Sequence, residues 1–358
     1  MDTLQYTKNI LSNTVYLLIL LSVATFIVFC PVITAEYSLI DDYDAVASIM
    51  NNSLTSLKSI FFPAEHEGGY YRPLLCLSQY LDKLFWGMNP IITHAENILL
   101  HIWNVTWLYF LVQRMQPSAQ EKFSSSFLAA LIFAVHPLVT ESVCWYSGRT
   151  DLLATAFVLP ALYLIMVFKN ENKFSYRIFI SVCLLMLAGV MSKESSLAVL
   201  IAIPFLNSSS QQSKDISNSV SSFPQWYFYL LVASIVISLL IALFYFKFLP
   251  ALILMLFCLI IGFYFKNNVL ISGYQRYVRG VFNLFVLFFT VLVLFWGMRA
   301  VVFSSSTSRI SQTINLMLQD IDYTVGMFMG AVGFYLKKFF LPLPLNFTIR
   351  EIDPTYQL

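Results

Sequence analysis

The sequence predicts an all-α polytopic membrane protein, and three observations lead to this fold class. Apolar runs of bilayer length recur along the 358 residues, of which 58% are hydrophobic. Asp, Glu, Lys and Arg make up only 11% of the chain, whereas a soluble domain carries roughly 25%. Backbone groups in lipid must be hydrogen-bonded within the protein, which favours helices over open strands. We therefore expect residues 1–358 to form one domain of about nine to ten transmembrane helices.

The first apolar run is interpreted as a permanent membrane span. "NTVYLLILLSVATFIVFCPVI" is too long for the apolar region of a secretory signal, and no small-residue cleavage site follows it. The apolar segments cover residues 13–33, 92–113, 124–141, 151–168, 177–191, 195–206, 227–248, 249–265, 279–303 and about 322–342.

The distribution of lysine and arginine predicts the orientation. Basic residues concentrate in "QRMQPSAQEK", "KNENKFSYR", "NSSSQQSKDISNS" and "KNNVLISGYQRYVR", which places these loops and the N-terminus in the cytoplasm. The outer side then receives a first loop at 34–91, two short turns near Arg149 and Lys193, and a second loop and tail at about 304–358. We expect a bacterial inner membrane with a periplasm-facing site, with the endoplasmic reticulum membrane as the alternative.

The first outer loop contains a predicted interfacial helix. In "RPLLCLSQYLDKLFWG", apolar positions 74, 75, 77, 81, 84 and 85 form one helical stripe that is too short to cross a bilayer. Pro73 suits the first helical position, and Tyr80 and Trp86 suit headgroup depth. "GMFMGAVGFYLKKFFLPLPLNF" has a similar character near the C-terminus.

Several classes of site find little support in the sequence. No basic patch with interleaved aromatic residues is present, which argues against a nucleic-acid partner. The cysteines lack a CxxC pair and resemble buried small hydrophobes, although a disulfide between Cys76 and Cys144 is the alternative. The histidines do not predict a metal site. We expect no cofactor, and a divalent cation is the alternative.

Ionisable residues gather at the predicted outer ends of the spans, where they are costly unless they face a cavity or a partner. The candidate residues are Asp41, Asp42 and Asp44 after the first span, Arg72 before the interfacial helix, His136, Glu141, Arg149 and Asp151 between spans three and four, and Lys193 and Glu194 between spans five and six. On one membrane face, such cations can hold a phosphate and a carboxylate can activate a hydroxyl.

Each cluster also has a structural interpretation. The aspartates can start a hydrated loop, Arg72 can extend to the headgroups, and Lys193 can pair with Glu194. The second span carries a polar stripe at helical spacing, formed by His94, Asn97, His101 and Asn104. Hydrogen bonding between helices is the favoured interpretation of this stripe, and substrate contact by His94 is the alternative.

The motifs resemble a known family in their order. "DDYDA", "YYRPLLCLSQYLDKLFWGMNP", "HAENILLHIWN", "HPLVTESVCWYSGRTDLLA" and "MSKESSLAVLIAIP" resemble the GT-C superfamily of membrane glycosyltransferases. Within it, they are most similar to the transmembrane O-mannosyltransferases with tetratricopeptide repeats and their bacterial homologues. The resemblance covers about residues 15–206, and the sequence ends without a repeat domain, which leaves acceptor recognition open.

The resemblance implies a glycosyltransferase that uses a polyprenyl- or dolichyl-phosphate sugar and a protein or glycan acceptor at the outer membrane face. Asp41 and Asp42 match the acidic pair that supplies the catalytic base. The positions implied to line the donor-phosphate and acceptor pocket are Arg72, His136, Glu141, Arg149, Asp151, Lys193 and Glu194.

Two alternatives of another class stay open. One is a non-catalytic GT-C-like subunit that positions a partner subunit or a membrane lipid. The other is a transporter of a lipid-linked sugar, which is disfavoured because the polar residues gather on one face instead of at the bilayer midplane.

Overall fold

A computed structural model describes residues 2–38, 42–51, 57–62, 71–115, 119–170, 176–199, 291, 295 and 320–340. Every regular element in these ranges is a helix, in agreement with the all-α prediction. Asp41 lies outside the described residues, as do most of the spans predicted between 195 and 303.

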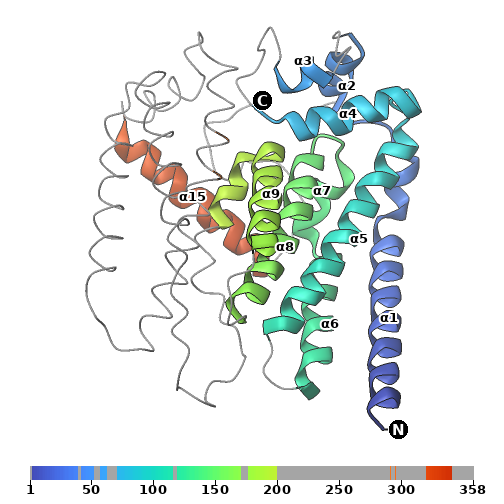
Figure 1. Cartoon of the computed structure of the whole chain (residues 1–358). Helices are drawn as coiled ribbons and strands as arrows, with labels where there is room; N and C mark the ends of the chain where they lie inside the picture. Colours follow the sequence, from blue (N-terminus) through green and yellow to red (C-terminus); the bar gives the residue numbers. More distant parts are fainter. Residues whose placement is uncertain are drawn as a thin grey trace.

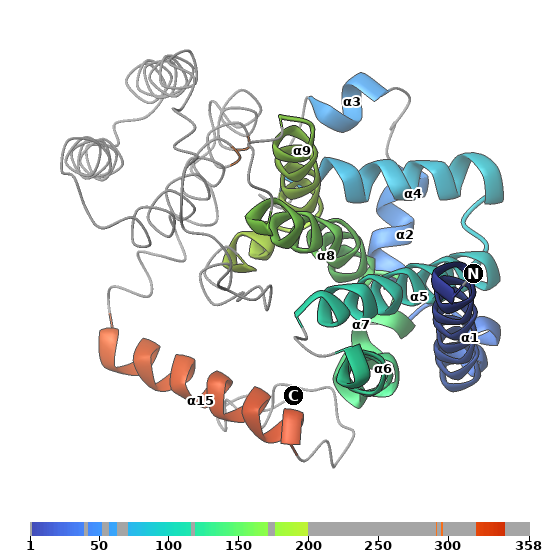
Figure 2. The same cartoon turned by 60° about the horizontal axis from the view of Figure 1, so that its bottom comes forward.

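Five long helices run side by side and form the described bundle (Figures 1 and 2). They are α1 (Asp2–Phe29), α5 (Pro90–Met115), α6 (Ala119–Val135), α8 (Arg149–Asn170) and α9 (Tyr176–Ser192). Helix α5 is central because it contacts α1, α6 and α8, and α8 in turn contacts α9. The 3-10 turn η1 (Cys30–Thr34) extends α1.

Apolar side chains of two helix groups form separate core clusters. Leu21, Val105, Tyr109, Ala130 and Ala134 are buried between α1, α5 and α6. Between α8 and α9, Gly189 permits close packing, since a Cβ at this position would lie 3.1 Å from Cγ2 of Val158. Small residues at such contacts are typical of helices that associate within a membrane.

Within the described ranges, two helices are long and apolar enough to cross a membrane, Thr14–Thr34 and Arg149–Val167. The number rises to three if Ser124–Val135 and Pro137–Cys144, which bend by 49°, form one span. The second half of this pair comprises η2 (Pro137–Val139) and α7 (Thr140–Cys144). These spans support an integral membrane protein, and the full set of nine to ten spans remains a prediction.

The polar stripe of α5 faces its neighbours, as expected for hydrogen bonding between helices. His94, Asn97, His101 and Asn104 are all buried. A ring nitrogen of His101 lies 3.1 Å from the carbonyl oxygen of Ala134 on α6, and Asn104 donates to that of Leu152 on α8 (3.1 Å). Asn97 donates to Val143 and Trp145 between these helices (3.3 and 2.9 Å). These contacts pair one side-chain nitrogen of each of the three residues, whereas Nδ1 of His101 and Oδ1 of Asn104 have no hydrogen-bond partner within the described residues.

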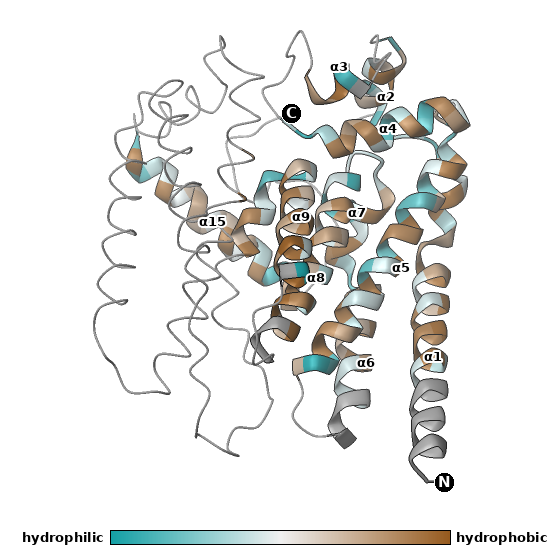
Figure 3. Ribbon diagram, in the orientation of Figure 1, coloured by the Kyte–Doolittle hydropathy of each residue, from teal (hydrophilic) through white to brown (hydrophobic). Residues whose placement is uncertain are grey.

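The predicted interfacial helix is present as α4 (Pro73–Trp86), which lies across one end of the bundle (Figure 1). Proline stands in its first turn, and it ends at Gly87, whose φ of 60° is left-handed and suits glycine. Gln79 and Asp82 are buried while Leu84 and Phe85 are exposed. Figure 3 shows the resulting mixture of hydrophilic and hydrophobic positions along α4.

Shorter elements surround α4. Helices α2 (Asp42–Asn51) and α3 (Leu57–Phe61) contact it, and α9 continues into the 3-10 turn η3 (Glu194–Ala198). Near the C-terminus, α15 (Ile321–Phe340) carries many exposed large hydrophobic side chains and is not among the candidate spans. Cys76 and Cys144 are both free, so the alternative of a disulfide between them is wrong.

Candidate functional site

Two partly exposed ion pairs form a cluster at the α4 end of the bundle. Lys193 donates through Nζ to Oδ1 of Asp151 (2.6 Å), and Arg72 donates through Nε to Oε2 of Glu194 (3.1 Å). Because Lys193 and Glu194 are consecutive residues, the two pairs adjoin. The structure therefore brings together four predicted site residues that come from three distant segments of the chain, and we call them the charge cluster.

Local sequence explains where these four side chains stand. Arg72 is the residue before α4 and precedes Pro73, which disfavours helical backbone at the position before it. Asp151 lies in the first turn of α8. Lys193 has an extended backbone between α9 and η3, with Glu194 in the first turn of η3. All four residues thus stand at helix ends.

The charge cluster has chemical capacity that its internal pairs leave unused. Side-chain exposure is 28% for Lys193 and 22% for Arg72, so neither cation is sealed from a ligand. Oε1 of Glu194 is buried and has no hydrogen-bond partner within the described part of the chain. Arginine and lysine side chains that stay partly exposed can hold a phosphate.

Asp42 is fully buried at the first residue of α2. Its Oδ2 accepts the backbone N–H groups of Ser38 (3.2 Å) and Tyr146 (3.1 Å), and its Oδ1 accepts that of Ser147 (2.9 Å). The carboxylate therefore ties the start of α2 to the turn before α8. This geometry favours an anchoring role for Asp42. Asp44, the third aspartate of this candidate cluster, is exposed.

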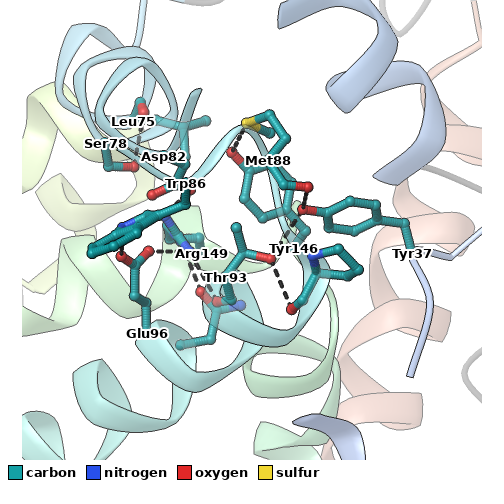
Figure 4. A network of polar contacts seen from close by, with 12 residues as sticks. Tyr37, Leu75, Ser78, Asp82, Trp86, Met88, Thr93, Glu96, Tyr146 and Arg149 are labelled. Atoms are coloured by element: carbon teal, nitrogen blue, oxygen red, sulfur yellow. Dashed lines mark hydrogen bonds and ion pairs between the residues drawn. The ribbon is translucent and has the colours of Figure 1, made fainter. Parts of the chain in front are cut away.

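Arg149 occupies the centre of a second, buried network (Figure 4). Its Nε donates to Oδ1 of Asn97 (2.8 Å), and its Nη1 donates to Oδ2 of Asp82 (2.5 Å). Its Nη2 donates to the carbonyl of Thr93 (2.9 Å) and to Oε2 of Glu96 (3.0 Å). All three guanidinium nitrogens are engaged, so the geometry favours a structural role over the phosphate contact expected from the sequence.

Asp82 and Glu96 were not predicted as members of any site. Burial, with a smaller contribution from the neighbouring Glu96, raises the pKa of Asp82 to about 7 against the opposing effect of Arg149. Trp86 donates through Nε1 to Oε1 of Glu96 (3.1 Å). The sequence offered one signal for Asp82, because its carboxylate stands among the apolar positions of the interfacial helix. That signal was not decisive, since a carboxylate at the same position could equally face water.

His94 is buried beside Tyr37, with 6.0 Å between the ring centroids. Within the described residues, neither of its ring nitrogens has a hydrogen-bond partner. Tyr37 donates to the carbonyl of Met88 (2.9 Å) and pairs with the hydroxyl of Thr93 (3.1 Å). His94 is therefore buried in the first turns of α5, next to the ring of Tyr37. Its contact with a substrate stays a prediction.

His136 contacts α15 and no member of the charge cluster among the described contacts. Its Nδ1 accepts the N–H of Leu138 (3.2 Å), so Nε2 carries the proton and donates to the carbonyl of Phe339 (3.1 Å). The two rings also stack, with centroids 5.7 Å apart. Glu141 is exposed in the first turn of α7. Within the described ranges, no group of three or more His, Cys, Asp or Glu side chains could hold a metal ion.

Comparison with known proteins shows distant, partial similarity to protein O-mannosyl-transferases. Tmtc1 of Drosophila melanogaster is 37% identical over 134 residues, which are 37% of this chain and 15% of that protein. TMTC3 of Mus musculus is 29% identical over 170 residues, 44% of this chain and 18% of that protein. F38B6.6 of Caenorhabditis elegans is 29% identical over 182 residues, 46% of this chain and 25% of that protein.

The matched regions therefore span a quarter or less of the length of these three relatives. No family model matches the chain, and no solved structure matches it. The similarity agrees with the GT-C resemblance of the sequence motifs at the level of the family.

Proposed function

We propose that this protein is a membrane glycosyltransferase of the GT-C type. It transfers a hexosyl group, with mannose as the first candidate, from a polyprenyl- or dolichyl-phosphate donor to a hydroxyl of a protein acceptor. The observation that carries the proposal is the charge cluster, where Arg72, Asp151, Lys193 and Glu194 meet at one end of the bundle. The similarity to protein O-mannosyl-transferases supports the same reaction class.

The cations of the charge cluster hold the donor phosphate. Lys193 and Arg72 are partly exposed, so they can exchange carboxylate oxygens for phosphate oxygens without the full desolvation penalty of a buried pair. When the bond between the anomeric carbon and the phosphate oxygen breaks, negative charge grows on the leaving phosphate. Preorganised cations stabilise this charge in the transition state.

A carboxylate takes the proton of the acceptor hydroxyl as its oxygen bonds to the anomeric carbon. Both oxygens of Asp42 already accept backbone N–H groups. We therefore assign the base to Asp41 and the positioning of its loop to Asp42. Attack opposite the leaving phosphate inverts the configuration at the anomeric carbon.

The site faces the lumen of the endoplasmic reticulum in this proposal. The relatives reported above are animal proteins, and the basic loops place residues 34–91 on the side opposite the cytoplasm. The sequence alone favoured a bacterial inner membrane with a periplasmic site, and that location is the alternative in this proposal.

The test is mannosyl transfer from dolichyl-phosphate mannose to a serine/threonine peptide by the purified full chain in liposomes. We expect Asp41→Asn to lower the rate by about 10²–10⁴-fold at unchanged melting temperature, because it removes the base. Asp42→Asn should lower both the rate and the melting temperature. Asp44→Asn is the matched control and should retain activity. Full activity in both Asp41→Asn and Asp42→Asn contradicts the assignment of the base to this pair.

A second candidate is a non-catalytic subunit that positions lipid or a partner enzyme. It is favoured by the extent to which Asp42 and Arg149 are occupied by internal contacts. This candidate predicts no transfer by the chain alone. Transfer that appears only with an added partner subunit, and that survives Asp41→Asn, would favour it over the enzyme.

A further inference from the structure

We propose that Asn51, at the exposed C-terminal end of α2, is the acceptor of an N-linked glycan. Asn51, Asn52 and Ser53 form the triplet Asn-x-Ser, which is the acceptor motif for this modification. The inference rests on the lumenal placement of residues 34–91 in the proposed function, and it does not depend on the transfer activity of the chain.

Four such triplets occur in the sequence, and they differ in environment. They begin at Asn51, Asn104, Asn207 and Asn346. The triplets at Asn207 and Asn346 lie outside the described residues, as do Asn52 and Ser53 of the first triplet. A comparison of the other two shows why the motif alone does not decide which asparagine is modified.

Asn51 and Asn104 stand in opposite surroundings. Asn51 is exposed as the last residue of α2. Asn104 is fully buried within α5, and its Nδ2 donates to the carbonyl of Leu152. A sugar attaches to this amide nitrogen, so Asn104 is blocked by packing as well as by its depth in the bundle. Asn51 meets the access requirement.

The end of α2 that carries Asn51 is held in place by α4. Lys83 donates through Nζ to the carbonyls of Ile49 (2.9 Å) and Met50 (3.3 Å), the two residues before Asn51. At its other end α2 is anchored through Asp42 to the turn before α8. Asn51 therefore lies on the same end of the bundle as the charge cluster, and it shares the membrane side of that cluster.

The predicted loops assign a side to each remaining triplet. Asn51 lies in the first outer loop, and Asn346 lies in the second outer loop and tail, so both face the lumen. Asn207 lies at the start of a basic loop assigned to the cytoplasm. Modification at Asn51 and at Asn207 in the same molecules is therefore incompatible with a single orientation.

The modification is a group transfer carried out by another enzyme of the lumen, with a lipid-pyrophosphate-linked oligosaccharide as co-reactant. A bond forms between Nδ2 of Asn51 and the anomeric carbon of the reducing-end sugar. The bond from that carbon to the pyrophosphate oxygen breaks, and lipid pyrophosphate leaves with the electron pair. The amide proton passes to a base of that enzyme. The glycan adds a bulky hydrophilic group beside exposed Met50.

The test is expression of the full chain in animal cells, followed by peptide-N-glycosidase treatment, gel mobility and mass spectrometry of the tryptic peptides. We expect the enzyme to increase the mobility of the wild type, and Asn51→Gln and Ser53→Ala to lose one glycan. Ser53→Thr should keep that glycan because it preserves the motif. Asn104→Gln and Asn207→Gln are matched controls and should leave the number of glycans unchanged.

Three outcomes overturn the inference in different ways. An unmodified Asn51 together with a modified Asn346 rejects the site and leaves the orientation standing. A glycan at Asn207 reverses the orientation and removes the lumenal site of the proposed function as well. Absence of glycan at every triplet rejects the site alone. A glycan at Asn51 in a chain without mannosyl transfer keeps this inference and rejects the proposed function.

Discussion

The two ion-pair networks at the α4 end use the same chemistry at different depths. Arg149 and Asp82 have side chains that are 2% and 3% exposed, whereas those of Lys193 and Asp151 are 28% and 42% exposed. Removing one partner of a buried pair leaves an uncompensated charge, while an exposed pair contributes little to stability. Burial therefore distinguishes an arginine that holds helices together from a lysine that is accessible to a ligand.

The largest expected effect is on stability and comes from the buried network. Arg149→Leu removes the guanidinium that joins Asp82 of α4 to Asn97 of α5. We expect the free energy of unfolding to fall by about 3–5 kcal/mol, because Asp82 is left buried without its partner. Thermal unfolding of the purified protein in detergent measures this loss.

Two further variants sharpen this prediction. Arg114 is an exposed arginine in the last turn of α5. Arg114→Leu should change the free energy of unfolding by no more than about 0.5 kcal/mol. The double variant Arg149→Leu/Asp82→Leu should recover part of the loss because it removes the unpaired carboxylate. Equal destabilisation by Arg149→Leu and Arg114→Leu contradicts the structural role of Arg149.

The second effect is on activity and comes from the charge cluster. Lys193→Ala should lower the rate of mannosyl transfer by about 10²–10³-fold, as expected when one group that stabilises transition-state charge is removed. The melting temperature should change little, because the pair with Asp151 is partly exposed. Transfer from dolichyl-phosphate mannose and thermal unfolding are measured on the same preparation.

Matched variants separate charge from packing at this position. Lys193→Arg keeps the positive charge and should retain much of the rate, whereas Lys58→Ala, an exposed lysine on α3, should retain all of it. If Lys193→Ala transfers mannose as fast as the wild type, the phosphate is held elsewhere and the distinction between the two networks fails.

The smallest expected effect is a pH dependence of stability that originates in the buried network. The pKa of Asp82 is raised from 3.8 to about 7 in the folded protein. Between these values the folded state binds more protons than the unfolded state, so stability falls as the pH rises. The contribution is complete below about pH 4 and is lost as the pH passes about 7.

Melting temperatures between pH 5 and pH 8 measure this dependence. We expect the wild type to melt roughly 5–8 °C lower at pH 8 than at pH 5, corresponding to about 2–3 kcal/mol. Asp82→Asn should flatten the profile because it cannot titrate, and Asp44→Asn should not alter it. A profile in Asp82→Asn that follows the wild type assigns the pH dependence to other groups.

The periodic parts of this protein were predictable from local sequence. The apolar stripe and Pro73 predicted α4, which spans Pro73–Trp86, because helical spacing and a proline at the first turn are local properties. The polar stripe of α5 was likewise visible as residues three or four apart. Its four members are buried, and three of them, Asn97, His101 and Asn104, form the hydrogen bonds to neighbouring segments that the favoured interpretation predicted.

The partners within the site could not be predicted in the same way. Arg149 and Asp82 are 67 residues apart, and Asp42 meets the backbone of Ser147 across 105 residues. Nothing in the local sequence distinguished Asp82 from its neighbour Lys83 as a site residue. In the structure, Asp82 is buried and pairs with Arg149, whereas Lys83 donates to a carbonyl at the end of α2. The sequence singled out Arg149 correctly as unusual but did not show that its donors are used inside the protein.

Sequence alone predicted a helical integral membrane protein whose ionisable residues concentrate at helix ends on one side, and the described residues are helical with two or three candidate membrane spans. These properties follow from hydropathy, period and the cost of charge in lipid, all of which act on neighbouring residues. Which charges are buried and which stay accessible depends on the packing of the helices. Burial depends on how α4, α5, α8 and α9 pack around each side chain, and that packing gives Arg149 its structural place and leaves Lys193 and Arg72 exposed enough to meet a phosphate.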